Sequence, residues 1–120
     1  MKPEINGTAF GSITIRGRTY GHDVIIQLDG EVKKRKKKLS RAIFGTSHVV
    51  SLDEAEGVYE KGAERLIIGT GQYGVLRLSE EAADFFGKNG CLVDLQPTPQ
   101  AIRVWNEARE KVVGLFHVTC

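Results

Sequence analysis

Residues 66–71 read Leu-Ile-Ile-Gly-Thr-Gly, three large aliphatic residues that run directly into a glycine-bracketed turn. Three consecutive aliphatic residues without polar alternation need apolar cover on both faces of a strand. Such a strand belongs to a sheet that lies between two other layers. Gly69 and Gly71 free the backbone where the strand leaves the sheet. The stretch therefore predicts an α/β fold built around one buried strand.

Helix signals alternate with apolar runs on both sides of this stretch. Ser51 and Glu54 form a capping box that predicts a helix over 52–61. Ser79 is expected to cap a second helix and Thr98 a third. The apolar runs predict strands over 66–68, 75–78, 91–95 and 112–118. This order predicts an α/β three-layer arrangement around a mixed, largely parallel central sheet.

The first third of the chain reads as antiparallel β structure. Residues 12–15 alternate in polarity, and residues 22–28 carry a second apolar run. Asp29-Gly30 predicts a two-residue turn with positive φ, so that residues 31–33 return beside the preceding strand. Residues 39–50 show little periodicity and are expected to form a loop with room for a short strand.

Length and composition indicate one domain over residues 1–120, since 41% of the residues are hydrophobic and the chain is long enough for a single core. No apolar run is long enough to span a membrane, and the start lacks the basic and apolar segments of a secretory signal. A cytoplasmic location is therefore expected. Cys91 and Cys120 have no metal-ligand spacing, so we expect reduced thiols and no metal or other cofactor.

Positive charge is concentrated in one segment. Residues 29–41 contain seven Lys or Arg and two acidic residues, whereas the rest of the chain has ten basic and thirteen acidic residues. These cations cannot all face a core, so an exposed strand edge or a mobile loop is expected. Nucleic-acid phosphates are an alternative partner for the run. The candidate contacts would be Lys34, Arg35, Lys36, Lys37 and Lys38.

A solvated edge that resists aggregation is the preferred interpretation of this basic run. No aromatic platform or base-reading helix accompanies it, and both are typical of nucleic-acid modules. We therefore expect nucleic-acid binding to be weak and independent of sequence.

The chain resembles the Mth938-like domain family in several motifs. These motifs are the stretch 66–71, Thr98 and Ala101 in the last predicted helix, Asn106 in the same helix, and His-Val-Thr-Cys at 117–120. The resemblance covers nearly the full length and implies a three-layer α/β fold around a mixed sheet with an added β-hairpin. The family includes proteins of unknown function, a mammalian adipogenesis-associated protein and an assembly factor for mitochondrial respiratory complex I. It implies no established reaction, cofactor or catalytic residue.

The turn after the buried strand is the leading candidate for a ligand site. Ligands of open α/β sheets usually bind beyond the carboxyl ends of the strands. The candidate ligand-binding residues are Gly69, Thr70, Gly71, Tyr73, His48 and Thr98. The spacing is not a dinucleotide fingerprint, because no helix begins at the turn. A tight turn that only joins two strands explains the glycines equally well.

The side chains best suited to proton transfer are His22, Asp23 and His48, but no nucleophile motif accompanies them. His117 and Cys120 provide too few ligands for a closed metal site, so His117 is expected to be structural.

The preferred hypothesis is a non-catalytic ligand-binding or protein-interaction module with its pocket at the Gly69-Thr70-Gly71 turn. Its partner would be another protein or a small polar ligand, and the chain would be a monomer or a weak homodimer. Two alternatives stay open: a small enzyme that uses His48 or Asp23 in that pocket, and a weak nucleic-acid binder that uses Lys33 to Lys38.

Overall fold

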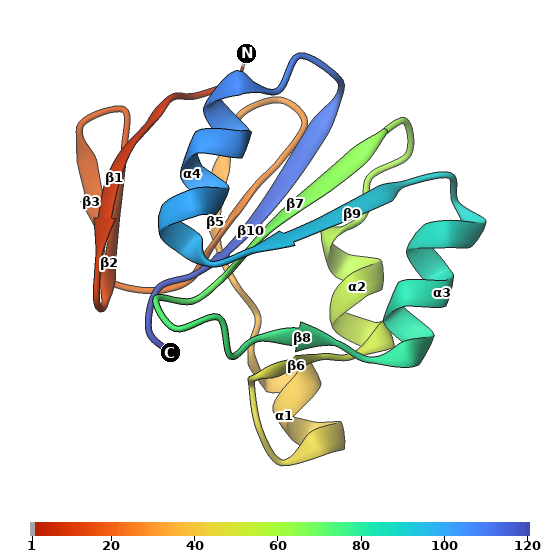
Figure 1. The fold of residues 1–120 in the computed structure, drawn as a ribbon. Helices are drawn as coiled ribbons and strands as arrows, with labels where there is room; N and C mark the ends of the chain where they lie inside the picture. The colour runs from red at the N-terminus through yellow and green to blue at the C-terminus, as the bar shows by residue number, and fades with distance from the viewer. Residues whose placement is uncertain (1) are drawn as a thin grey trace.

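A five-stranded mixed sheet lies at the centre of the computed structural model, which describes residues 2–120 (Figure 1). Its strand order is β5-β4-β10-β7-β9. Strand β10 pairs in parallel with β7, and β7 with β9, whereas the pairs β10–β4 and β4–β5 are antiparallel. The bounds are β4 Val24–Ile26, β5 Val32–Lys34, β7 Arg65–Thr70, β9 Leu92–Gln96 and β10 Val112–His117. The predicted α/β class with a mixed central sheet is confirmed.

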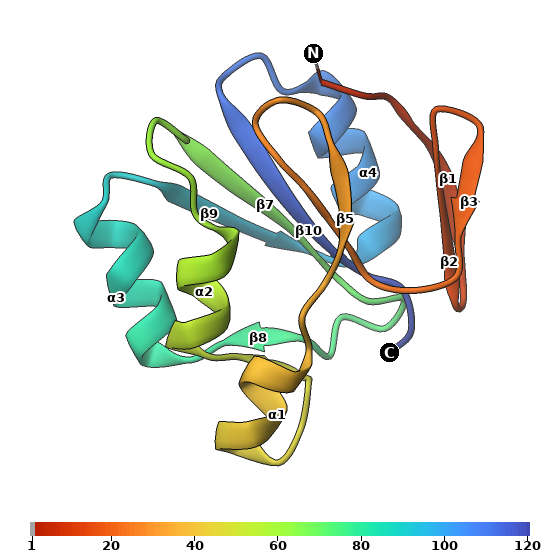
Figure 2. The same ribbon diagram turned by 180° about the vertical axis from the view of Figure 1, so that it is seen from behind.

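Two layers cover this sheet (Figures 1 and 2). Helices α2 and α3 cover one face, and α4 with the antiparallel sheet β1-β2-β3 covers the other. Helix α1 and the parallel pair β6–β8 lie beyond one end of the sheet. The bounds are β1 Ile5–Ala9, β2 Ser12–Ile15, β3 Arg18–Tyr20, α1 Lys38–Phe44, β6 Val49–Val50, α2 Leu52–Val58, β8 Arg77–Leu78, α3 Glu80–Lys88 and α4 Thr98–Glu107.

Strand β7 is buried on both faces, as its aliphatic sequence predicts. Ile67 belongs to the apolar cluster beneath α4 and β1-β2, whereas Leu66 and Ile68 belong to the cluster beneath α2 and α3. The neighbouring β10 divides its side chains in the same way, with Leu115 on the α2 side and Phe116 on the α4 side. The two central parallel strands therefore contribute to both cores, which is why their central side chains are apolar on both faces.

Two of the three predicted helix caps are confirmed. The hydroxyl oxygens of Ser51 and Ser79 accept hydrogen bonds from main-chain amides three residues later, at 3.2 and 3.1 Å. The cap predicted at Thr98 is wrong, because Pro97 is the cap and Thr98 is the first helical residue. The Thr98 hydroxyl donates instead to the main-chain oxygen of His117 at 2.6 Å. A tertiary hydrogen bond has replaced the local one.

The hairpin between β4 and β5 forms as predicted, but its turn is longer. The amide of Gly30 donates to the carbonyl oxygen of Gln27, and the amide of Gln27 donates to that of Glu31, both at 2.9 Å. These bonds enclose a three-residue loop in which Gly30 has a φ of 88°. Only the glycine takes a positive φ there, which selects the three-residue loop over the predicted two-residue turn.

Helix α1 was not predicted, because residues 39–50 were expected to form a loop. The helix has no side-chain cap at its start, and on the face of Leu39 and Ile43 its apolar stripe is only one turn long. It ends at Gly45, which has a φ of 70° and donates its amide to the carbonyl oxygen of Arg41. A stripe this short gives too little periodicity to predict a helix from the sequence. Strand β1, also absent from the prediction, contains a glycine that weakens its strand signal.

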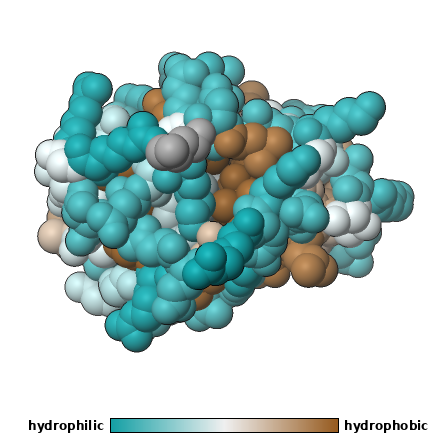
Figure 3. Space-filling view, turned by 90° about the horizontal axis from the view of Figure 1, so that it is seen from above, coloured by the Kyte–Doolittle hydropathy of each residue, from teal (hydrophilic) through white to brown (hydrophobic). Residues whose placement is uncertain are grey.

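The surface at the top of Figure 1 is mostly hydrophilic. Figure 3 looks down on it and shows apolar side chains gathered in a hollow near the middle. Within residues 2–120, no helix combines the length and the apolar character that crossing a membrane requires.

Gly114 in β10 offers a test of core packing. A Cβ atom added there would lie 2.6 Å from Cε2 of Phe116 and 3.0 Å from Cζ3 of Trp105. Both rings are fully buried, so we expect Gly114→Ala to lower the free energy of unfolding by about 1–3 kcal/mol. The matched control is Gly87→Ala in α3, where an added Cβ meets nothing within 4 Å.

The control is expected to raise the free energy of unfolding by about 0.5–1 kcal/mol, because alanine is the better helix former. Urea denaturation at neutral pH measures both variants. Equal changes in the two variants would contradict the packing argument.

Candidate functional site

A buried ion cluster lies where the parallel strands of the central sheet end. It consists of Asp23 before β4, Arg35 after β5, Glu54 in α2 and His117 at the end of β10. All four residues are at most 3% exposed. We call these four residues the ion cluster. Buried charges of this kind persist only when they are paired and hydrogen-bonded.

Arg35 is the centre of the ion cluster. Its Nη1 donates to Oδ2 of Asp23 at 2.9 Å, and its Nε and Nη2 donate to the two carboxylate oxygens of Glu54 at 2.5 and 3.0 Å. Nη2 also donates to the carbonyl oxygen of Ser47 at 2.7 Å. Glu54 accepts a further hydrogen bond from the hydroxyl of Ser40. The bidentate fork uses the planar geometry of the guanidinium, which a lysine could not reproduce.

Asp23 links the ion cluster to the last strand. Its Oδ2 accepts a hydrogen bond from Nδ1 of His117 at 2.8 Å, and its Oδ1 accepts one from the amide of Val118 at 2.9 Å. Burial raises the pKa of the Asp23 carboxyl, but the hydrogen bond and charge of His117, the Val118 amide and Arg35 together lower it to about 2. Asp23 is therefore an ionised structural carboxylate.

Asp23 is poorly suited to the role of catalytic base that the enzyme alternative assigns to it. A carboxyl group with a pKa of about 2 and 1% exposure is a poor proton acceptor. Nδ1 of His22 lies 2.9 Å from the carbonyl oxygen of Asp23, not from its carboxylate. His117 joins Asp23 to the hydroxyl of Thr119, whose Oγ1 lies 3.3 Å from Nε2, but the histidine is itself only 1% exposed. The acid and the imidazole of this arrangement are thus buried, whereas the Thr119 hydroxyl is only partly buried.

The glycine turn lies beside the ion cluster and is filled by the chain itself. The amide of Gly71 donates to the hydroxyl of Thr98 at 2.9 Å. A Cβ atom at Gly69 would approach the same hydroxyl to 2.8 Å. The carbonyl oxygens of Thr119 and Cys120 accept hydrogen bonds from the amides of Gln72, Tyr73 and Val75. The main-chain amides of this turn, which could otherwise have bound an anion, are therefore already hydrogen-bonded to other groups of the protein.

The other candidate residues at this turn are dispersed. Thr70 is buried, and the side chain of Tyr73 is 76% exposed beside Phe10. The ring of His48 lies edge-on to that of His117, with 5.4 Å between the centroids. Burial lowers the pKa of His48, as do the positive charges of His117 and nearby basic side chains. The structure thus brings Thr98 to the glycines and His48 to the ion cluster.

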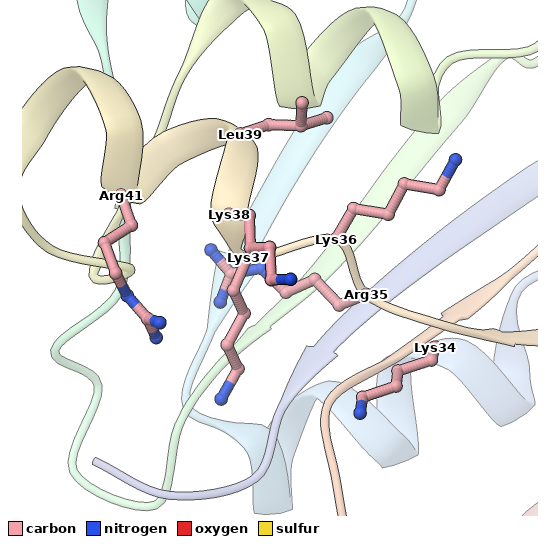
Figure 4. Close-up of a pocket in the computed structure, with 7 residues that line it drawn as sticks. All are labelled: Lys34, Arg35, Lys36, Lys37, Lys38, Leu39 and Arg41. Carbon is pink, nitrogen blue, oxygen red and sulfur yellow. The ribbon is translucent and has the colours of Figure 1, made fainter.

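Two adjoining cavities lie next to the ion cluster on its solvent side. The first has a volume of about 520 Å³ and is formed where the chain passes from β5 into α1 (Figure 4). The second, of about 190 Å³, shares Lys34, Lys36 and Leu39 with the first. We call the two cavities together the basic groove. It is lined by Ile25, Gln27, Lys33, Lys34, Arg35, Lys36, Lys37, Lys38, Leu39, Arg41, Glu54 and Gly57.

The basic run begins on the exposed edge strand β5, as expected, and then continues through one buried residue, Arg35, into helix α1. Arg35 is 3% exposed and is paired with both Asp23 and Glu54. The prediction that Arg35 is a candidate nucleic-acid contact is therefore wrong. Lys34, Lys36 and Lys38 stay exposed around it. The one sequence feature that could have indicated this buried ion pair is the single arginine within a run of lysines, because only arginine suits bidentate pairing with a carboxylate. Its partners were not visible in the sequence.

Comparison with known proteins gives a consistent result. A family model described as "Protein of unknown function (DUF498/DUF598)" matches residues 5–117. A conserved hypothetical protein from Pyrococcus horikoshii is 29% identical, with a TM-score of 0.88 over 98% of this chain and 99% of that chain. The protein named MT938 is 36% identical, with a TM-score of 0.83 over 99% of this chain and 100% of its own. A Mth938-like domain from Bordetella pertussis, 18% identical, shares the fold with a TM-score of 0.62 over 97% and 85% of the two chains.

Removing the charge of Asp23 is expected to destabilise the protein strongly. Asp23→Asn leaves Arg35 with only one carboxylate partner and deprives His117 of its acceptor charge. We expect the free energy of unfolding to fall by about 3–5 kcal/mol, the usual effect of breaking a buried ion pair. The matched control is Asp94→Asn, which breaks a partly exposed ion pair with Arg65 and should cost at most about 1 kcal/mol. Urea denaturation compares the two, and similar losses would contradict the central role of the ion cluster.

The Asp23 carboxyl should make the free energy of unfolding depend on pH. Its pKa falls from 3.8 to about 2 on folding, so its contribution is complete above 3.8 and is lost as the pH drops through about 2. The difference corresponds to about 2 kcal/mol. We expect the stability difference between the wild type and Asp23→Asn to shrink over this interval, measured by urea denaturation at a series of pH values. A difference that stays constant down to pH 2 would show that the carboxyl does not titrate as described.

Proposed function

We propose that this chain, which belongs to the DUF498/DUF598 family of proteins of unknown function, is a non-catalytic binding module whose basic groove receives an acidic segment of a partner protein. Family membership confirms the resemblance to Mth938-like domains seen in the sequence motifs. The observation that carries the proposal is the groove itself. Exposed cations surround a half-buried leucine in a cavity of about 520 Å³.

The cations of the groove are available to a ligand. Lys34, Lys36, Lys38 and Arg41 are exposed, whereas the charge of Arg35 is balanced by Asp23 and Glu54 in the core. Arg35 also fixes the path of the chain between β5 and α1, so the main chain of the neighbouring lysines is held in place before a ligand binds. A preorganised site loses less conformational entropy on binding.

Apolar surface in and beside the groove favours a protein segment over a nucleic acid. Leu39 belongs to both cavities, and Ile43 lies four residues later on the same face of α1 with 55% exposure. A ligand that complements this surface carries both carboxylates and apolar side chains. Among the groove-lining residues of the described chain there is no aromatic side chain on which a base could stack. The groove is preferred over the glycine turn because the main-chain donors of that turn are already used.

Binding to a model acidic peptide tests this proposal. The probe is a synthetic peptide of alternating Glu and Leu residues, titrated into the ¹⁵N-labelled protein and followed by NMR chemical shifts. We expect shifts in the segment 34–41 and about a tenfold weaker affinity in the double variant Lys36→Gln/Lys38→Gln, from the summed loss of two surface charge contacts. Leu39→Ala should weaken binding as well, since it removes the apolar contact.

The matched control is Lys61→Gln/Lys88→Gln, which removes the same charge from exposed lysines elsewhere on the chain. We expect less than a twofold change for this control. A parallel titration with duplex DNA at physiological salt separates the two partner classes. Equal weakening by both double variants, or tighter binding of DNA than of the peptide, would overturn the proposal.

A further inference from the structure

Helix α1 reverses the usual burial pattern of a surface helix. Its buried residue is polar: the hydroxyl of Ser40 donates to Glu54 and accepts a hydrogen bond from the amide of Ser51 at 2.9 Å. Its apolar residues Ile43 and Phe44 are 55% and 39% exposed, and both lie outside the two apolar clusters of the described chain. A surface helix normally turns its apolar residues toward the core. The exposed pair therefore contributes little to folding.

The exposed apolar residues lie at a protruding end of the molecule. Residues 41–45 are all exposed, and Ala42, Ile43 and Phe44 follow one another without a polar residue between them. We call residues 41–45 the α1 tip. In Figures 1 and 2, α1 projects from the end of the molecule opposite the N-terminus. An exposed apolar patch with a polar rim is typical of a surface that meets a protein or a membrane.

The segment that carries the α1 tip has charges of one sign only. Residues 32–52 contain seven Lys or Arg and no Asp or Glu, whereas the rest of the chain has ten basic and fifteen acidic residues. The exposed cations of this segment are Lys33, Lys34, Lys36, Lys38 and Arg41. They outnumber the exposed carboxylates of the adjoining helix α2, which are Asp53 and Glu56. One end of the molecule is therefore positive, and the remainder is acidic.

We infer that the α1 tip binds an anionic membrane surface, with Ile43 and Phe44 inserted at the level of the lipid headgroups. The flanking cations would lie against the acidic headgroups, and the apolar stems of the lysines would add to the buried area. Stable attachment at an interface combines apolar area with attraction to anionic lipids. A cluster of roughly four to eight Lys or Arg is the usual pattern for recognition of acidic lipids.

This combination favours a lipid surface over the other anionic partners. A protein segment fits the concave basic groove, whereas the α1 tip is convex and suits a soft layer that closes around it. A nucleic acid supplies phosphates but no apolar medium for Ile43 and Phe44. The inference goes beyond the proposed function, because Phe44 lies outside the set of residues that line the basic groove. The two surfaces share cations, so the experiment rests on the apolar residues that they do not share.

Cosedimentation of the full chain with lipid vesicles tests this inference. We expect binding to vesicles of equal parts phosphatidylglycerol and phosphatidylcholine, and at least about tenfold weaker binding to phosphatidylcholine alone. Ile43→Ser/Phe44→Ser should weaken binding to the mixed vesicles at least about tenfold, because it removes the inserted apolar area. The matched control is Leu92→Ser/Leu95→Ser, which removes two leucines of β9 that are 74% and 43% exposed. The control should change binding less than about twofold, and urea denaturation verifies that both double variants are folded.

Tryptophan fluorescence supplies an independent measurement. Trp105 is the single tryptophan of the chain and is fully buried, so its emission is a constant background. In the variant Phe44→Trp, mixed vesicles should shift the emission to shorter wavelengths, because the indole moves from water into the headgroup layer. The same vesicles should leave the emission of the control Leu92→Trp unchanged.

Several results would overturn the inference. These are no binding to the mixed vesicles, equal binding to neutral and mixed vesicles, equal weakening by the two double variants, or an unshifted emission of Phe44→Trp. Leu39→Ala separates this inference from the proposed function, since it should weaken binding of the acidic peptide but change vesicle binding less than about twofold. If Leu39→Ala weakened both equally, the tip and the groove would form one protein-binding surface, and the membrane inference would be wrong.

Discussion

The pairing of the Arg35 guanidinium with two buried carboxylates is the interaction on which the remaining structure depends. It connects the start of β4 through Asp23, the end of β5 through Arg35 and helix α2 through Glu54. Asp23 extends the connection to His117 and Val118 at the end of β10. Elements from four parts of the chain are therefore fixed by one set of hydrogen bonds. Because an unpaired buried charge is so unfavourable, these elements keep their positions together.

This cluster also explains why a lysine-rich segment is ordered. Like charges repel, so a run of five lysines favours an extended and mobile chain. One arginine within the run turns inward and is neutralised, while the exposed lysines around it stay solvated. The segment is held at its buried residue, and helix α1 begins three residues later. The basic groove thus owes its shape to a residue whose own charge is hidden from solvent.

The usual ligand position of an open α/β sheet is occupied here by the protein itself. Beyond the carboxyl ends of β7 and β10, the space is filled by the Thr98 hydroxyl and by the main-chain oxygens of residues 119 and 120. Exposed charged and apolar side chains lie instead at the two edges of the sheet, β5 and β9. The β5 edge leads into the basic groove, where lysines surround Leu39, and the β9 edge carries the exposed Leu92 and Leu95.

The sequence by itself determined the features that depend on residues close together in the chain. The aliphatic run of β7 predicted a sheet covered on both faces, and Ser51 and Ser79 predicted two helix starts, because burial pattern and capping act over a few residues. Only the tertiary structure decided the pairing of Arg35, the role of Thr98 and the filling of the glycine turn. Asp23 and His117 are 94 positions apart, and Thr98 bonds to a strand 19 positions away. Such contacts form when the fold brings distant segments together, and no local pattern specifies which polar groups will meet.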